Sequence, residues 1–512
     1  MSEREWREAS DLRMSRIGLA AVLVTAAILR FWALGHGIPH SVQVDEPEIV
    51  ERAINMMRSG SLNPRGFFDY PGLYLYVQFV VSCVRFIYGA IAGEWNSLAA
   101  ATTPSFYLWG RAVTAGFGVA TVFLVFQIGL RWGGRHGLLA AALMAVMPLH
   151  VRYSHYVLTD TPLTFFVTLT LLLSLIAHER NRAWLFAMAG VAAGLAAATK
   201  YNGGLALVMP LVACWMTVPA RPSRTISALA TIGGAMAAFV VAAPYTLLDL
   251  PGFLNVFARL SGEYRRGAVP LEAPWATYLK HLRLNFGLPA LLMVLAGAIM
   301  GLVRVVRGPG RVRWAVLLVF PLFHFWMISR QQIVYGRYLL PLVPMLCVLA
   351  ATAVISGVSL LRRYEIPRAP RSTLIAALTV LALLPPALTA IAWARDASRD
   401  WTPELAYQWI VANLPEGSRV VLESRELLLP GRFESLNVSQ LRMKKYEDYV
   451  ADGVDYLVSS SQVNGRYLQA PQQYPREYAD YMTLFTQCRE LVRFTPSADH
   501  PGPELRILKV RP

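Results

Sequence analysis

The stretch Pro71–Ile91, PGLYLYVQFVVSCVRFIYGAI, decides how the rest of the chain is arranged. Its length and apolar character fit a membrane-spanning helix, which needs about 20 apolar residues. It also holds several residues typical of the headgroup region of a bilayer: Tyr74, Tyr76, Gln78, Arg85 and Tyr88. A helix of that kind lies on the membrane surface. The two interpretations place every later loop on opposite sides of the membrane.

The composition excludes a soluble enzyme and a disordered chain. Of 512 residues, 55% are hydrophobic and only 16% are charged, whereas soluble domains have about 25% charged residues. Three of the four cysteines lie inside apolar segments, which excludes a disulfide framework and a cysteine-based zinc site; the four are Cys83, Cys214, Cys347 and Cys488. The chain is therefore expected to be a polytopic, mainly α-helical membrane protein.

Apart from residues 71–91, we expect eleven spans, each marked by an apolar run. They lie at residues 17–34, 106–130, 137–149, 163–177, 184–199, 203–218, 226–243, 286–303, 314–328, 339–358 and 374–393.

The arginines between these runs set the orientation, because short cytoplasmic loops are rich in Lys and Arg. Arg4, Arg7, Arg13 and Arg16 precede the first span, which predicts a cytoplasmic N-terminus. Five later loops are basic, with arginines at 131 and 135, 180 and 182, 221 and 224, 304 to 313, and 362 to 371. All five fall inside only if residues 71–91 lie on the outer surface. We therefore predict a surface helix there.

This topology predicts two domains. Residues 1–393 form the transmembrane domain, with large outer loops at about 35–105 and 244–285. Residues 394–512 form a small α/β domain outside, with a helix at 406–414 and strands at 419–422 and 455–459. This tail has 15 Lys and Arg against 16 Asp and Glu, so the net charge of +16 belongs to the membrane part. Much of it marks topology, and we predict no nucleic-acid partner.

Charged residues on the predicted outer face are candidates for function, because ionisable groups at a membrane are costly. The acids are Asp45, Glu46, Asp69 and Asp160, and the bases are Lys200, Arg337, Arg265 and Arg266. Structural explanations compete with this one. Asp45 and Glu46 precede a helix that starts at Pro47, and Asp160 is placed to cap a span. His150 and His155 suit an interface as well as a metal.

Acids and cations together at the membrane surface suit an enzyme that uses a lipid phosphate. Cations stabilise a leaving phosphate, and a carboxylate takes the proton of an acceptor hydroxyl. The order of the motifs also resembles a known family. They are Asp45-Glu46, Asp69-Tyr-Pro-Gly-Leu-Tyr74, Gly110-Arg111, Thr159-Asp160-Thr-Pro-Leu163, Thr199-Lys200-Tyr-Asn-Gly-Gly204, Arg337-Tyr338-Leu-Leu-Pro341 and Trp409-Ile-Val-Ala-Asn-Leu-Pro-Glu-Gly417.

In these motifs the chain resembles the GT-C fold glycosyltransferases that use polyprenyl-phosphate sugars, in particular bacterial protein O-mannosyltransferases and aminoarabinose transferases. The resemblance implies a bacterial plasma-membrane enzyme. It would pass a monosaccharide to a lipid, glycan or protein acceptor on the outer face, with inversion. It also implies catalytic roles for Asp45, Glu46 and Asp160. It leaves the need for a divalent metal open.

The same resemblance implies residues for the substrates. Lys200, Arg337 and Tyr338, with Arg265 and Arg266, would contact the donor phosphate, and Asp69, Tyr70 and His155 the substrate. One departure stands out. Relatives often have His-Pro-Pro or Glu-Lys-Pro where this chain has Asp69-Tyr70-Pro71. A phosphate-binding lysine that some relatives carry there is missing. Its role could pass to Lys200, to Arg337 or to the basic loop 259–283, although that loop also suits a surface helix that contacts anionic lipid headgroups.

Two other functions stay open at this stage. A transporter or lipid flippase usually has internal repeats and ionisable residues near mid-membrane. The chain shows no clear repeat between its halves, and its acids lie at span ends. A membrane scaffold without catalysis, whose outer domain binds a partner, is the second alternative, and the set of outer acids and bases argues against it.

Overall fold

The structure is a computed structural model that describes residues 3–101, 104–217, 223–266, 272–308, 310–360, 368–423 and 427–510. The chain divides into two compact units. A helical unit contains residues 1–32, 53–84 and 110–393. The second unit contains residues 394–512 together with residues 33–52 and 85–109, two segments that the sequence assigned to the transmembrane domain.

Each of the eleven predicted spans overlaps a helical segment. These segments are α1 (Glu3–Phe31), α4 (Pro104–Gly129), α5 (Gly134–Ala145), α7 (Asp160–Arg180), α8 (Ala183–Thr199), η1 (Tyr201–Leu207) with α9 (Val208–Met216), α10 (Arg224–Ala242), α13 (Pro274–Arg307), α14 (Arg311–Ile328), η2 (Gly336–Leu342) with α15 (Val343–Leu360), and α16 (Arg368–Ala397). Within the described ranges, eight helices are long and apolar enough to cross a membrane. That set includes Gly72–Ile91, so the number of spans stays a prediction.

Shorter helices connect these segments: α2 (Pro47–Ser59), α6 (Pro148–Tyr153), α11 (Tyr245–Leu248) and α12 (Leu250–Arg266). The predicted helix after Asp45-Glu46 is confirmed as α2, whose apolar side chains Ile49, Val50 and Ile54 are buried. It ends before Gly60, which has a positive φ of 64°.

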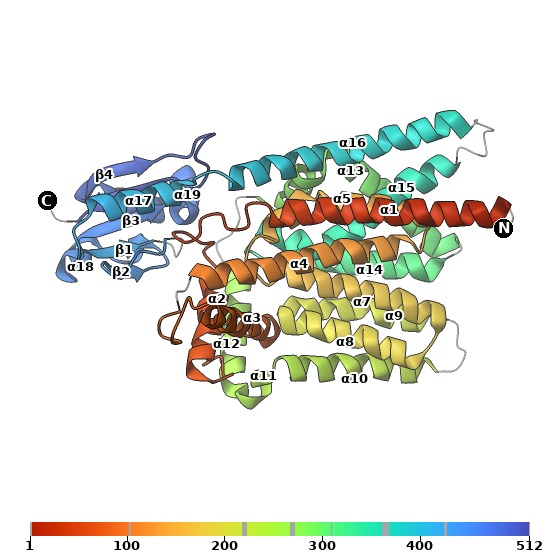
Figure 1. Ribbon diagram of the computed structural model, residues 1–512, viewed down its shortest axis with the longest axis horizontal. Helices are drawn as coiled ribbons and strands as arrows, with labels where there is room; N and C mark the ends of the chain where they lie inside the picture. Colours follow the sequence, from red (N-terminus) through yellow and green to blue (C-terminus); the bar gives the residue numbers. More distant parts are fainter. Residues whose placement is uncertain are drawn as a thin grey trace. The chain divides into compact units, whose positions relative to one another are not determined.

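Residues 71–91, whose placement sets the side of every later loop, form α3 (Gly72–Ile91). Figure 1 shows α3 nearly end-on, whereas α7, α8 and α10 run across the picture, so α3 is not parallel to these long helices. Such an inclination is what a helix on the membrane surface requires. The surface location itself stays a prediction.

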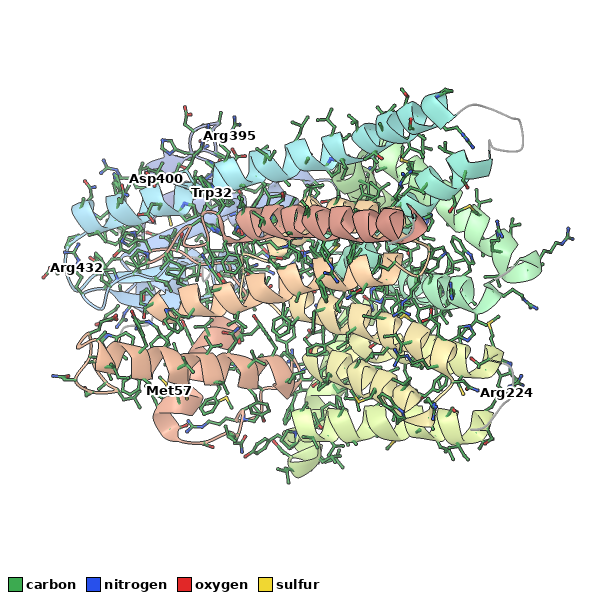
Figure 2. All side chains as sticks on the ribbon, turned by 45° about the vertical axis from the view of Figure 1, so that its right-hand side comes forward. Trp32, Met57, Arg224, Arg395, Asp400 and Arg432 are labelled. Carbon is green, nitrogen blue, oxygen red and sulfur yellow. The ribbon has the colours of Figure 1, made fainter. Side chains whose placement is uncertain are left out.

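Three of the predicted cytoplasmic loops meet at one end of the helical unit. Arg313 Nη1 donates to the carbonyl of Arg131 at 3.0 Å, and its Nη2 lies 3.5 Å from Glu179 Oε1. Arg131 also pairs with Glu179. Trp32 and Arg224, both labelled in Figure 2, lie at opposite ends of this helix bundle. Arg221, Arg362 and Arg363 lie outside the described residues.

The hairpin of α7 and α8 is held in place by close packing against α10. A Cβ atom at Gly190 would lie 2.0 Å from the carbonyl oxygen of Thr231, and one at Gly194 would lie 2.2 Å from that of Ala235. Backbones approach this closely only where a residue has no side chain. The end of α8, where Lys200 follows, is therefore fixed relative to its neighbours.

The predicted α/β domain is confirmed, with a mixed sheet in the order β2-β1-β3-β5-β4 among the described residues. Its strands are β1 (Arg419–Leu422), β2 (Glu434–Asn437), β3 (Tyr456–Ser460), β4 (Arg489–Phe494) and β5 (Leu505–Lys509). The helices and short turns are α17 (Thr402–Asn413), η4 (Leu441–Met443), α18 (Tyr446–Ala451), α19 (Ser461–Gln469) and α20 (Pro475–Gln487). β1 pairs in parallel with β2 and β3, whereas β5 is antiparallel to β3 and β4.

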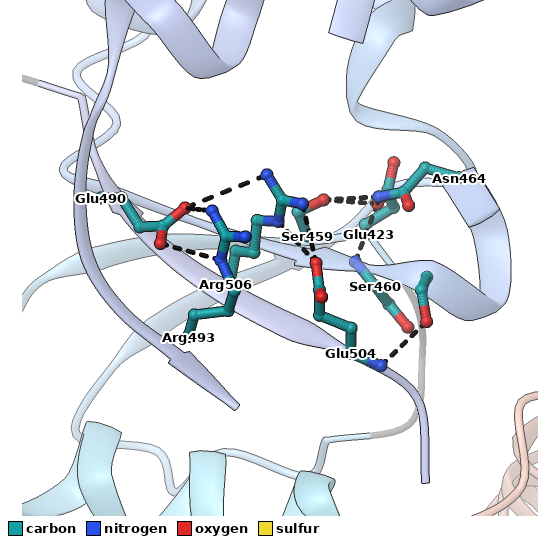
Figure 3. A network of polar contacts seen from close by, with 9 residues as sticks. Glu423, Ser459, Ser460, Asn464, Glu490, Arg493, Glu504 and Arg506 are labelled. Carbon is teal, nitrogen blue, oxygen red and sulfur yellow. Dashed lines mark hydrogen bonds and ion pairs between the residues drawn. The ribbon is translucent and has the colours of Figure 1, made fainter. Parts of the chain in front are cut away.

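A buried carboxylate organises the carboxyl ends of β1 and β3 (Figure 3). Glu423, only 1% exposed, follows β1. In the described part of the chain its oxygens accept hydrogen bonds from five groups: the Tyr481 hydroxyl (2.5 Å), Ser459 Oγ (3.1 Å), Asn464 Nδ2 (2.9 Å) and the amides of Ser460 (2.9 Å) and Leu441 (3.1 Å). Burial raises the pKa of Glu423, and these donors oppose that shift.

We expect Glu423→Gln to weaken this sheet. The side-chain NH₂ group of the glutamine would face groups that now donate hydrogen bonds to a carboxylate oxygen of Glu423. An unsatisfied buried donor costs about 1–3 kcal/mol, so amides of β1 and β3 should exchange with deuterium about tenfold faster in the full-length protein. Glu416→Gln, which removes a surface ion pair with Arg432 (3.3 Å), is the matched control. An equal effect of the control would mean that charge, not the network, is responsible.

Candidate active site

The site begins with an ion pair between the two ends of the α7–α8 hairpin. Asp160 is the first residue of α7, and Lys200 follows α8. Lys200 Nζ lies 2.7 Å from Asp160 Oδ1, with side chains 13% and 4% exposed. The N-cap position belongs to Thr159, and no side-chain cap bond forms there. The carboxylate of Asp160 therefore serves a tertiary contact instead of capping its own helix.

The turn η2 adds a second cation and a ring to this pair. Arg337 Nε lies 3.9 Å from Asp160 Oδ2, which is an ion-pair distance and too long for a hydrogen bond. The ammonium of Lys200 lies 5.0 Å from the centre of the Tyr338 ring. Two cations thus share one buried carboxylate, and the formal charge of the three groups is positive. Such a group attracts an anion.

Helix α12 supplies the next layer. The hydroxyls of Tyr264 and Tyr338 lie 2.8 Å apart. Burial raises the pKa of Tyr264, which keeps this phenol neutral and able to donate. The ring of His324, on α14, holds the other side of Tyr338, with Nε2 3.0 Å from its carbonyl oxygen. Tyr338 is therefore fixed from two sides.

A cavity of about 500 Å³ opens beside this cluster. Its polar lining comes from Asp69, Tyr70, Lys200, Asn202, Ser261, Arg330 and Gln331, and its apolar and aromatic lining from Tyr201, Phe257, Leu260, Tyr264, Trp326, Met327 and Tyr338. The cavity thus brings together four residues predicted from the sequence, which are Asp69, Tyr70, Lys200 and Tyr338. A cation, hydrogen-bonding groups and aromatic rings in one space suit an anionic sugar lipid.

Asp69 sits at the rim of the cavity and is paired with α12. Arg259 Nη2 lies 2.6 Å from Asp69 Oδ1, and both side chains are well exposed. The hydrogen bond to Asp69 raises the pKa of Arg259. The carbonyl of the preceding Phe68 accepts a bond from the Tyr201 hydroxyl at 2.9 Å. The segment with Phe68 and Asp69 is thereby tied to both α12 and η1.

Asp45 and Glu46 belong to the second unit, where they form a tight turn before α2. The amide of Asp45 donates to Gln43 Oε1 at 2.7 Å, and the amide of Gln43 donates to Glu46 Oε2 at 2.9 Å. Glu46 is fully buried, whereas Asp45 is partly exposed. Glu46 thus holds the turn, and Asp45 is the more accessible carboxylate.

The two histidines singled out from the sequence contact the protein backbone or an arginine. The Nδ1 and Nε2 atoms of buried His155 each lie 2.9 Å from a carbonyl oxygen, those of Val151 and Trp32. His150 Nδ1 lies 3.0 Å from Arg30 Nη2. A role for His155 in substrate binding stays a prediction.

The sequence left the question of a metal open, and the candidate ligands do not gather into a metal site among the described residues. The carboxylates of Asp69 and Asp160 face cations. Within the described ranges, no group of three or more His, Cys, Asp or Glu side chains is placed to hold a metal ion.

Sequence reasoning missed several residues with clear roles. Arg330 lines the cavity and stacks 4.6 Å from the centre of the Trp326 ring. Arg30, fully buried on α1, donates to the carbonyls of Ala145 (2.9 Å) and Met144 (3.0 Å), which end α5. The sequence feature that could have singled out Arg30 is its position as an arginine at the end of an otherwise apolar run. The side chains of the predicted Arg265 and Arg266 lie outside the described part of the structure.

Known proteins share both part of the sequence and the fold. Residues 77–258 match the family model of dolichyl-phosphate-mannose-protein mannosyltransferases. The ArnT structure from Cupriavidus metallidurans, bound to undecaprenyl phosphate, matches with a TM-score of 0.57 and 16% identity over 97% of each chain. The Archaeoglobus fulgidus oligosaccharyltransferase in its apo form matches with a TM-score of 0.58 and 14% identity, covering 96% of this chain and 74% of that one. The chain has a GT-C fold.

The predicted GT-C resemblance is thereby confirmed. Another structure of the archaeal enzyme, called AglB, contains an inhibitory peptide and a dolichol-phosphate, and it matches with a TM-score of 0.56 and 14% identity over 96% of this chain and 74% of that one. None of the curated protein sequences is significantly similar to this GT-C chain.

We expect Asp160→Asn to destabilise the helical unit by up to about 3–5 kcal/mol, because it leaves two largely buried cations without their counter-ion. Adding Lys200→Met should restore part of that loss. Thermal unfolding in detergent measures both effects. The exposed pair of Lys280 and Glu272, 2.5 Å apart, is the matched control, and its removal should cost less than about 1 kcal/mol. Strictly additive effects of Asp160→Asn and Lys200→Met would contradict the coupling.

Proposed function

We propose that the chain is a membrane glycosyltransferase that moves a monosaccharide from a polyprenyl-phosphate carrier to an acceptor on the outer face of the membrane. The observation that carries the proposal is the buried, positively charged cluster of Asp160, Lys200 and Arg337 beside a cavity of about 500 Å³. The undecaprenyl phosphate in the ArnT structure and the dolichol-phosphate in the AglB structure support this class of carrier.

In this proposal the cations bind the donor phosphate. Lys200 and Arg337 balance its negative charge, which grows as the bond to the sugar breaks. Tyr338 and Tyr264 orient the phosphate through their hydroxyls, and Arg265 and Arg266 stay predicted contacts of the phosphate. Asp160 is a positioning residue for Lys200 and Arg337, because it fixes both cations.

Asp45 acts as the base and Glu46 holds its turn. The acceptor oxygen attacks the anomeric carbon from the side opposite the phosphate. The new carbon–oxygen bond forms as the bond to the phosphate oxygen breaks, and the polyprenyl phosphate leaves with that electron pair. The acceptor proton passes to the carboxylate of Asp45. This single displacement inverts the configuration. Asp69, Tyr70 and His155 are the proposed contacts for the substrate.

The sidedness of the proposal follows from charge. The end of the helical unit that carries Arg131, Arg224 and Arg313 is placed in the cytoplasm by the positive-inside rule. The family resemblance, not the charge pattern, is the reason for proposing the bacterial plasma membrane, with residues 394–512 outside the cytoplasm. The acceptor is a lipid, a glycan or a protein.

We expect Asp45→Asn to abolish sugar transfer, with a loss of about 10²–10⁴-fold, which is the usual contribution of a general base. The test is deletion of the gene, complementation with each variant, and mass spectrometry of surface glycans, glycoproteins and lipids. Glu48→Gln is the matched control, because Glu48 is the next acid along and pairs with Arg52 at 2.8 Å. Full restoration by Asp45→Asn at wild-type membrane levels would show that Asp45 is not the base.

We expect Lys200→Ala to weaken the binding of undecaprenyl phosphate to the purified protein by roughly tenfold or more, since a hydrogen bond to a charged group contributes about 1.5–3 kcal/mol. Native mass spectrometry in detergent measures the affinity. Undecaprenol, which lacks the phosphate, should bind the wild type and the variant equally, and Lys280→Ala should behave as the wild type. Equal binding of undecaprenyl phosphate by Lys200→Ala would remove Lys200 from the phosphate site.

A further inference from the structure

The segment that carries Asp45 packs on the C-terminal part of its own unit. Residues 33–52 and 394–512 fall in the same compact unit. Ser41 forms an antiparallel bridge with Leu427. The amide of Leu428 donates to the carbonyl of His40 at 2.8 Å. Backbone contacts therefore fix the path of the chain five residues before Asp45.

The side chain of His40 strengthens this contact through helix α17. His40 Nδ1 lies 2.6 Å from Glu404 Oε1, and the side chains are 31% and 12% exposed. The imidazole stacks on Tyr407, with ring centres 4.0 Å apart and planes 25° apart. Gln408 Nε2 donates to the same oxygen of Glu404 at 3.2 Å. His36 lies close to Trp401, with ring centres 5.9 Å apart.

The turn that delivers His40 to α17 depends on Gly37. Its φ is 76°, a region that favours glycine. A Cβ atom there would lie 2.6 Å from Ser41 Oγ and 2.7 Å from the Ser41 carbonyl oxygen. The amides of His40 and Ser41 both donate to the Gly37 carbonyl, at 2.9 and 2.6 Å. The turn is thus compact and leads directly into the turn of Gln43 to Glu46.

The segment that these contacts hold has little regular structure of its own. Helix α1 ends at Phe31, α2 begins at Pro47, and the residues between them form neither a long helix nor a sheet. Side chains on loops are positioned less accurately than those on regular elements. A misplacement of about 1 Å at a reacting group can lower a rate by about 10²-fold.

We infer that the C-terminal α/β part of the chain is a positioning device for the Asp45 carboxylate, with His40 and Glu404 as its positioning residues. The inference rests on the proposed function. In this inference α17 holds residues 37–46 in one conformation, so that the Asp45 carboxylate meets the acceptor oxygen in one orientation. Binding of the donor phosphate belongs to Lys200 and its neighbours and should not depend on this contact.

The test compares His40→Ala and Glu404→Ala with Glu404→Gln in the full-length protein. Glu404→Gln keeps an oxygen that accepts from the imidazole and should retain most function. The matched control is Lys444→Ala, which removes a surface ion pair with Asp452, 2.6 Å long, elsewhere in the same unit. Three quantities are measured: deuterium exchange of residues 37–46, affinity for undecaprenyl phosphate, and product formed by the complemented deletion strain.

We expect both alanine variants to exchange about tenfold faster over residues 37–46 and to lose about 10- to 100-fold of transfer, with unchanged affinity for undecaprenyl phosphate. Partial rescue by Glu404→Gln would support the inference further. Unchanged exchange in both alanine variants would overturn it, and so would faster exchange with full transfer. If the wild type forms no product while the variants exchange faster, the proposed function fails and the docking of the segment on α17 stands.

Discussion

The carboxylate of Asp160 joins three parts of the chain that are far apart in sequence. It starts α7, contacts the lysine after α8, and faces the arginine of η2. Each of these residues sits at or near the end of a helical segment. A buried carboxylate costs free energy unless a cation compensates it, and a buried cation costs free energy unless an anion compensates it. The three groups therefore depend on each other, and the positive excess that they retain can be balanced by an anion such as a phosphate.

The rigidity of this cluster comes from packing that carries no charge. Gly190 and Gly194 let α8 approach α10 closely, which fixes the end of α8 and thus Lys200. Tyr338 is held between the hydroxyl of Tyr264 and the ring of His324. A preorganised cation stabilises developing charge better than a mobile one, because it does not have to reorganise during the reaction. The oxygens of Asp160 and Asp69 face cations in this structure.

Much of this arrangement could be predicted from the sequence, because membranes impose simple rules. Apolar runs predicted the helical segments, and the basic loops predicted that Arg131 and Arg313 share one end, as their direct contact confirms. Basic residues on the outer side, against the general trend, singled out Lys200 and Arg337. The sequence did not predict which charges pair, because pairing depends on tertiary distances. The contacts of His40 with Glu404 and of Asp69 with Arg259 join residues far apart in sequence, and no local pattern indicates them.

The two units solve different problems of positioning. A cation at the end of a packed helix is positioned by that helix. Lys200 follows α8, which pairs with α7 and packs closely on α10. Asp45 lies on a connecting segment instead, which includes a glycine turn and contacts α17. In the inferred positioning role, the C-terminal α/β part does not have to bind a substrate itself. Its buried hydrogen-bond network around Glu423 ties β1 to β3 and to α20.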